Sequence, residues 1–166
     1  MVKKYDGKVR VVYKNFVVHP DTATDAHLAA CASNKQGKYK AFKNAFWEKG
    51  FGAYMETRDA SKMSRENVLA IAKEVGLDTG KLETDMEACK PLLRSDMEEL
   101  SKFGVSGTPS FFVNGKFTMF SGPGPLVALI EQEIKAVEAS GVPADQFYET
   151  VVVGQGEKQF KSAASK

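Results

Sequence analysis

The 166-residue sequence contains only two cysteines, Cys31 and Cys89, and two histidines. Two cysteines so far apart support neither a disulfide-rich scaffold nor a cysteine-rich zinc site. No apolar run approaches the roughly 20 residues that span a bilayer, and the first residues lack the apolar stretch of a secretory signal. Lys and Arg total 23 against 21 Asp and Glu. The net charge of +2 is therefore too weak to indicate a nucleic acid or a membrane as partner.

The hydrophobic content of 43% is enough for one substantial core, so one compact domain is expected. Residues 8–16 are rich in β-branched and aromatic side chains, which predicts a strand that closes before Pro20. From Thr22 the apolar residues follow helical spacing, with Leu28 and Cys31 on one face and Gly37 placed to end the helix.

A series of helices is predicted next. The first runs through Trp47 and offers Phe42, Phe46 and Trp47 as an aromatic surface. Residues 51–62 show no clear period and predict a surface loop, after which Ser64 caps a helix that stops at Gly76. A further helix carries Cys89, and Pro91 opens another that ends before Gly104.

A hairpin follows the helices. Residues 110–113 and 116–120 flank Asn114-Gly115, a pair typical of a two-residue turn in which both positions have positive φ. A long amphipathic helix is predicted over residues 126–137. Residues 142–153 favour a short helix, with a strand as the alternative, and the polar residues 154–166 predict a frayed end.

This order of strand, helical block, hairpin and helix resembles the DsbA-like branch of the thioredoxin superfamily. The most specific segment is Phe-Gly-Val-Ser-Gly-Thr-Pro-Ser-Phe-Phe-Val-Asn-Gly at residues 103–115, which is similar to the family segment that carries a cis-proline and leads into the hairpin. The resemblance implies an α/β, thioredoxin-like fold over residues 1–140 with a helical insertion at about 22–104. Residues 141–166 then form a C-terminal extension, a short helix followed by a flexible tail.

The resemblance also implies the activity of a bacterial, periplasmic or otherwise extracytoplasmic thiol-disulfide oxidoreductase or disulfide isomerase. Its substrates are cysteine-containing proteins or peptides, and no cofactor is implied. In the family a strand and a Cys-x-x-Cys at a helix N-terminus precede the strand that corresponds to residues 8–16, and this sequence contains neither. We therefore expect the chain alone to be inactive in disulfide exchange. The gap left by the central strand is expected to be closed in one of three ways: by a complementing segment, by a second copy as in a homodimer, or by a rearranged sheet.

Two other functions fit the same pattern. One is a redox-inactive module that binds peptides or proteins through its thioredoxin-type surface. The other is a glutathione-dependent transferase or isomerase of the kappa type, which shares the helix-inserted architecture. Disulfide exchange would separate the enzyme from the binding module, and glutathione affinity would identify the transferase.

Four residues carry the site predictions. The resemblance places Thr108 and Pro109 where an extended substrate binds, with a rigid entry into the hairpin as the structural alternative. Cys31 and Cys89 lie on the inward faces of predicted helices and are expected to be buried thiols, with a structural disulfide as the alternative and no catalytic role. His27, four residues before Cys31, is expected to be a hydrogen-bonded histidine rather than a metal ligand.

Overall fold

The computed structural model describes residues 2–118 and 122–156, which contain seven α-helices and one two-stranded sheet. The chain divides into two compact units, one formed by residues 14–99 and the other by residues 1–13 and 100–166. Each unit is described by itself. No helix of the described residues is long and apolar enough to cross a membrane.

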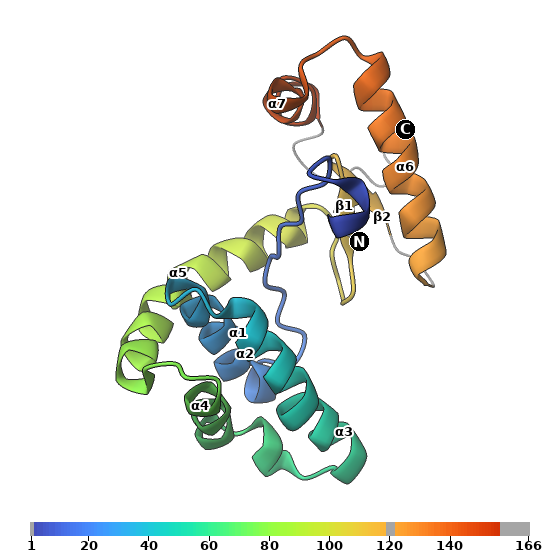
Figure 1. Cartoon of the computed structure of the whole chain (residues 1–166). Coiled ribbons are helices and arrows are strands. Elements are labelled where there is room, and N and C mark those ends of the chain that lie inside the picture. Colours follow the sequence, from blue (N-terminus) through green and yellow to red (C-terminus); the bar gives the residue numbers. More distant parts are fainter. Residues whose placement is uncertain (1, 119–121, 157–166) are drawn as a thin grey trace. The chain divides into compact units, whose positions relative to one another are not determined.

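The unit of residues 14–99 is helical. Helix α1 spans Pro20–Lys35 and contacts α2 (Tyr39–Phe46) and α4 (Arg65–Glu74), while α2 continues into a π-helical stretch at Trp47–Gly52 (Figure 1). The short helix α3 (Ala53–Thr57) and a 3-10 turn (Ala60–Met63) lead to α4. Helix α5 begins at Thr79 within this unit and ends at Lys102.

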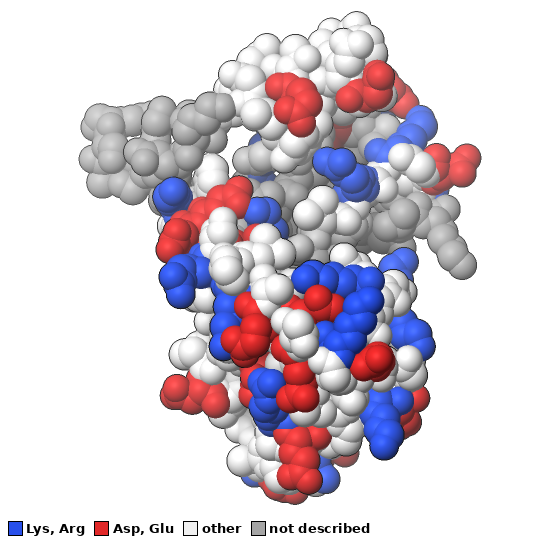
Figure 2. Space-filling view, turned by 90° about the vertical axis from the view of Figure 1, so that its left-hand side faces the viewer, with Lys and Arg blue, Asp and Glu red and all other residues white. Residues whose placement is uncertain are grey.

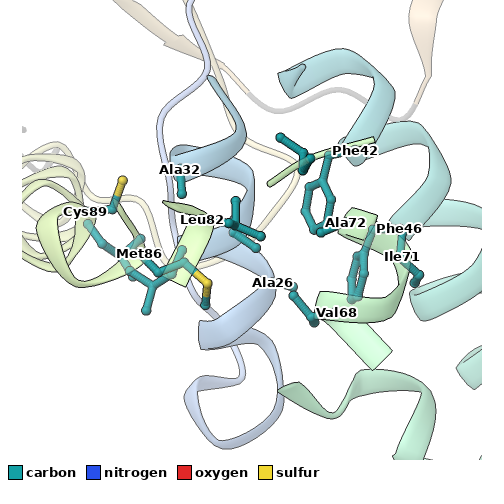
Figure 3. Close-up of a cluster of buried hydrophobic side chains, with 14 of the residues drawn as sticks. Ala26, Ala32, Phe42, Phe46, Val68, Ile71, Ala72, Leu82, Met86 and Cys89 are labelled. Carbon is teal, nitrogen blue, oxygen red and sulfur yellow. The ribbon is translucent and has the colours of Figure 1, made fainter. Parts of the chain in front are cut away.

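One apolar core holds these helices together. Figure 3 shows how Phe42 and Phe46 of α2 face Val68, Ile71 and Ala72 of α4. The α1 and α5 side of the same cluster contributes small and flexible side chains, namely Ala26, Leu28, Ala29, Ala32, Leu82, Met86, Cys89 and Leu93. Burial of this apolar surface is the main stabilising contribution to the unit.

Most of the predicted helix boundaries are confirmed by the backbone. The hydroxyl of Ser64 accepts a hydrogen bond from the Asn67 amide at 3.2 Å, which caps α4. Gly37 and Gly76 take the positive φ values of 69° and 76° after α1 and α4. These are the positions at which a left-handed residue ends a helix.

Two predictions within the helical block are wrong. Residues 51–62, predicted as a loop, form the end of the π-helical stretch, α3 and the 3-10 turn. The π-helical residues shift the phase of the apolar side chains and so conceal the helical period. Pro91 does not begin a new helix but lies inside α5, because Leu82, Met86, Cys89 and Leu93 form one apolar stripe that a continuous helix buries.

The predicted strand at residues 8–16 is also wrong. Residues 9–17 have no regular secondary structure, and Val11, Val12 and Tyr13 are exposed. Side-chain propensity favours an extended backbone, but a strand also needs a neighbour to accept and donate its backbone hydrogen bonds. No described strand supplies that neighbour here.

The other unit is built on a hairpin and a helix. Strands β1 (Phe111–Val113) and β2 (Lys116–Thr118) pair antiparallel with Phe112 opposite Phe117, and Asn114 and Gly115 turn with φ values of 46° and 78°. This confirms the predicted hairpin. Residues 119 and 120 of its predicted second strand lie outside the described residues. Helix α6 (Pro123–Ala139) contacts β1 and α7 (Ala144–Phe147), and the N-terminal 3-10 turn (Val2–Tyr5) places Lys4 against Glu131 of α6 at 2.7 Å.

The predicted helix over residues 142–153 is confirmed in place of the strand, as α7 and a second π-helical stretch at Tyr148–Val153. Most of the predicted frayed end, residues 157–166, lies outside the described residues. The division of the chain at residue 140 stays a prediction.

Candidate functional site

The loop between α5 and β1 holds the first two predicted site residues. Gly104, with a φ of 76°, ends α5, and the Val105 side chain is buried beside it. The peptide bond between Thr108 and Pro109 is cis, and both residues are exposed. The loop therefore presents a short exposed stretch of backbone directly before the hairpin.

Two contacts fix this loop at its ends. The hydroxyl of Ser110 donates a hydrogen bond to the Gly107 carbonyl at 2.7 Å, which closes the turn around Thr108 and Pro109. The rings of Phe103 and Phe112 meet edge to face, with centroids 5.9 Å apart. Because one ring precedes the loop and the other belongs to β1, the exposed residues are held between two anchored ends.

A buried carboxylate supports the other end of the hairpin. Glu133 of α6 is buried and accepts hydrogen bonds from Asn114 Nδ2 at 3.3 Å and from Lys116 Nζ at 2.6 Å. Both donors lie at the β-turn. A buried carboxylate is tolerated when it is paired in this way, so this ion pair ties the hairpin to α6.

The two cysteines form a disulfide, so the expectation of two buried free thiols is wrong. The Cα atoms of Cys31 and Cys89 are 6.2 Å apart and the residues are separated by 58 positions in sequence. Their inward helix faces meet, and the distance lies within the range that a bridge can span. Sequence spacing carries no information on whether the two faces touch, which is why burial alone did not distinguish the two outcomes.

Polar contacts reinforce the junction of α1 and α5. One turn after Cys31, Lys35 Nζ donates to Asp85 Oδ1 at 3.0 Å, and Asp85 lies one turn before Cys89. Asp85 Oδ2 is buried and has no hydrogen-bond partner among the described residues. The bridge is thus embedded between the apolar core and one ion pair.

A second polar network, on the other side of the bridge, includes His27. His27 Nδ1 lies 3.1 Å from Asn15 Oδ1, and the Asn15 backbone and side-chain amides donate to Asp96 Oδ2 at 3.0 and 3.3 Å. Burial lowers the pKa of His27, which favours the neutral ring. Among the described residues no group of three or more His, Cys, Asp or Glu side chains is arranged to hold a metal ion, and Cys31 is committed to the bridge.

The positions of Cys31 and Cys89 in their helices limit the reactivity of their sulfur atoms. A reactive thiolate in this superfamily depends on a helix N-terminus, where the helix dipole and unpaired amides lower the cysteine pKa. Cys31 lies in the C-terminal half of α1, and Cys89 is in the middle of α5. Neither cysteine occupies a helix N-terminus, and both are oxidised to a bridge.

The aromatic side chains predicted on one helix are divided between the core and the surface. Phe42 and Phe46 are buried, whereas Trp47 is 68% exposed, so the prediction of a shared buried surface is wrong for Trp47. Its ring instead packs against Phe51 with centroids 5.0 Å apart. Because an α-helix turns about 100° per residue, Trp47 lies off the face that Phe42 and Phe46 share.

The surface charge provides no single-sign patch on the face seen in Figure 2. Lys and Arg side chains are interspersed with Asp and Glu there. Several of these charges are paired within the unit of residues 14–99, as in the contacts of Arg65 with Asp25 and Glu83.

Sequence reasoning missed the residues that hold the hairpin loop and the disulfide in place. They are Ser110 and Glu133 at the hairpin, and the Lys35–Asp85 pair at the disulfide. The signal for Ser110 was its position directly after Thr-Pro, where a hydroxyl can accept or donate across a turn. A charged residue at an inward position of a helix, as at 133, was the signal for a buried ion pair.

These features match a known protein class. A family model, the DSBA-like thioredoxin domain, matches residues 3–135, and the chain therefore belongs to this family. Membership supports a thiol-disulfide oxidoreductase-type function on proteins that contain cysteines. A search of curated proteins found no match, and a search of solved structures found none.

Proposed function

We propose that this chain is the substrate-facing framework of a thiol-disulfide oxidoreductase and that it binds extended, cysteine-containing polypeptides at Thr108 and Pro109. The observation that carries the proposal is the family match across a loop in which these two residues are exposed directly ahead of the hairpin. The contacts of Ser110 and Phe103 hold that stretch in place, which reduces the entropy lost when a peptide binds.

We further propose that the 166-residue chain does not catalyse disulfide exchange by itself. Its two cysteines are joined to each other, and neither lies at a helix N-terminus. If a Cys-x-x-Cys segment is supplied, its thiolate attacks a substrate disulfide, one substrate sulfur leaves as a thiolate, and a mixed disulfide forms. The second cysteine then attacks the sulfur of the first, the bound substrate sulfur leaves as a thiolate, and a new bridge closes between the two cysteines.

The alternative of a redox-inactive binding module is favoured by the same bridge. It predicts polypeptide binding at Thr108 and Pro109 with no exchange even when a Cys-x-x-Cys segment is added. In both cases the buried Cys31–Cys89 bridge supports an oxidising, extracytoplasmic compartment. An insulin reduction assay with an added Cys-x-x-Cys segment distinguishes exchange from binding alone.

The binding test uses an unfolded protein whose cysteines have been alkylated, so that only non-covalent contacts are measured. We expect wild type to bind it and Thr108→Arg to bind at least about tenfold more weakly, because the longer side chain covers the exposed backbone. Thr84→Arg is the matched control, since Thr84 is an exposed residue of α5 in the other unit. Equal binding by wild type and Thr108→Arg would contradict the proposed site.

The exchange test uses insulin reduction with dithiothreitol as the electron donor. We expect the chain to add nothing to the rate with dithiothreitol alone. If the chain accelerates the reaction and Cys31→Ser abolishes the effect, then Cys31 is catalytic and the proposal is wrong on this point.

The exposed residues 10–12 support one further proposal, that a complementing segment from another polypeptide pairs with them as a strand. Val11 and Val12 are adjacent and both exposed, with Val12 at 65%, whereas a strand within a covered sheet buries such a pair on its two faces.

Hydrogen exchange combined with sedimentation tests this pairing. We expect a monomer in which the amides of residues 10–12 exchange rapidly, because no ladder of described strands protects them. A dimer with protected amides would show that a second copy fills the position instead. A monomer with protected amides would show that these residues pair directly within the chain, which excludes both partners.

A further inference from the structure

The two sulfur atoms of the bridge lie in different surroundings. Cys89 is 2% exposed and belongs to the apolar cluster beside Met86 and Ala32, as Figure 3 shows for its side chain. Cys31 is only partly buried and packs against the edge of that cluster. The bridge therefore has one end near solvent and one end in the core.

We propose that Cys31 is a site of mixed-disulfide formation with a small anionic thiol of the glutathione class. The thiolate attacks Cys31 Sγ and forms a new S–S bond, while the bond to Cys89 Sγ breaks. Cys89 leaves with the electron pair and takes one proton from water, so the bridge is opened by one equivalent of thiol and Cys31 carries the adduct. No other oxidant or reductant is needed.

Access decides which sulfur is attacked. Displacement at sulfur requires the nucleophile to approach in line with the bond that breaks, from the side opposite the leaving sulfur. Cys89 is 2% exposed and belongs to the apolar cluster, so the approach to its sulfur is covered by protein. Cys31 is only partly buried, so its sulfur is the more accessible of the two.

The surroundings of Cys89 also determine how long the adduct lasts. Reclosure of the bridge needs a Cys89 thiolate to attack the adduct at Cys31. Burial among apolar side chains disfavours that thiolate. The adduct forms slowly, because Cys89 is a poor leaving group, and it then persists.

This reaction uses neither Thr108 nor Pro109, which belong to the other unit. Its result and the result of the substrate-binding test are therefore independent. Loss of polypeptide binding in Thr108→Arg leaves the thiol reaction of Cys31 unchanged.

The test maps the adduct on the wild-type chain. The folded, oxidised protein is incubated with reduced glutathione, quenched with acid, and digested for mass spectrometry. We expect glutathione on Cys31 in at least about tenfold excess over Cys89 in native buffer, and equal labelling in denaturant, where both sulfurs are accessible. Similar labelling of both cysteines in native buffer, or no adduct on either, would overturn the proposal.

Two single variants give an independent readout. Both remove the bridge, so each is a stability control for the other, and their folding is checked by circular dichroism. In Cys89→Ser the remaining Cys31 thiol should react with a chromogenic disulfide at least about tenfold faster than the Cys89 thiol of Cys31→Ser. If Cys89 reacts as fast as Cys31 in the folded variants, the asymmetry does not exist. If either variant is unfolded, the wild-type mapping alone decides.

Discussion

Reduction of the Cys31–Cys89 bridge should destabilise the unit of residues 14–99 by about 4 kcal/mol. The bridge closes a loop across 58 positions, and the chain-entropy model for a loop of that length gives ~4 kcal/mol at 25 °C from the freedom restored to the unfolded chain. The apolar contacts of Cys89 persist in the reduced, folded protein. The loss therefore comes from the unfolded state and not from the core.

Urea denaturation followed by tryptophan fluorescence measures this loss directly. The chain has one tryptophan, Trp47, and it lies in the unit that the bridge closes. We expect the unfolding midpoint of the reduced protein to fall well below that of the oxidised protein. The slope with urea should rise, because an unfolded chain without the cross-link exposes more surface.

A Cys31→Ala/Cys89→Ala variant controls for the reductant. Its midpoint should not respond to reductant, and it should lie below that of the reduced wild type, because alanine in place of the buried Cys89 leaves part of the core unfilled. A difference below about 1 kcal/mol between oxidised and reduced wild type would refute the reasoning. It would mean that the segments of α1 and α5 stay close together in the unfolded chain even without the bridge.

Three further changes test the polar contacts of the same unit. Burial lowers the pKa of His27 in the folded protein, so its contribution to stability is present above its ordinary pKa of 6.5 and is lost as the pH falls through the folded value. Urea midpoints between about pH 7 and pH 5 should therefore fall more in wild type than in His27→Gln, and equal slopes would contradict this. Ser64→Ala removes the cap on the Asn67 amide and should cost about 1 kcal/mol in the same assay, whereas Ser64→Asp should restore it. Asp96→Ala leaves the Asn15 amides without their acceptor and should cost about 2 kcal/mol, and a cost near zero would show that water replaces the carboxylate.

Helices and the hairpin were predictable because their signals are local. The spacing of Leu28 and Cys31, the cap at Ser64 and the Asn114-Gly115 turn each fix a conformation within a few residues, and each is confirmed. The strand at residues 8–16 was not predictable on the same basis. Its side chains favour an extended backbone, but strand pairing is a property of a second segment that the pattern does not contain.

The two wrong predictions in the helical block have a common cause, which is the phase of the helical period. At Trp47 a π-helical stretch changes the phase, so residues 51–62 show no clear period although they are helical. At Pro91 the phase does not change, so the proline lies in a helix that continues past it. Comparing the helical phase of the apolar residues before and after each suspected break would have distinguished Trp47 from Pro91.

The candidate site was predictable where a motif marks it and not where a tertiary contact makes it. Thr108 and Pro109 were found from the segment at residues 103–115, and the structure places them in an exposed turn. The pairing of Cys31 with Cys89 depends on two helix faces that meet across 58 positions. No local pattern reports that contact.

A non-local clue was nevertheless present in the charges. Lys35 lies one turn after Cys31, and Asp85 lies one turn before Cys89. If two helices run in opposite directions and meet at their cysteines, a step forward on one corresponds to a step back on the other, which brings opposite charges together at 3.0 Å. Gln36, the next residue, exchanges hydrogen bonds with the backbone of Asp78, just before α5, at 3.0 and 3.2 Å. Two cysteines flanked by opposite charges at these complementary offsets therefore favour a bridge over two independent buried thiols, because the same packing satisfies both contacts.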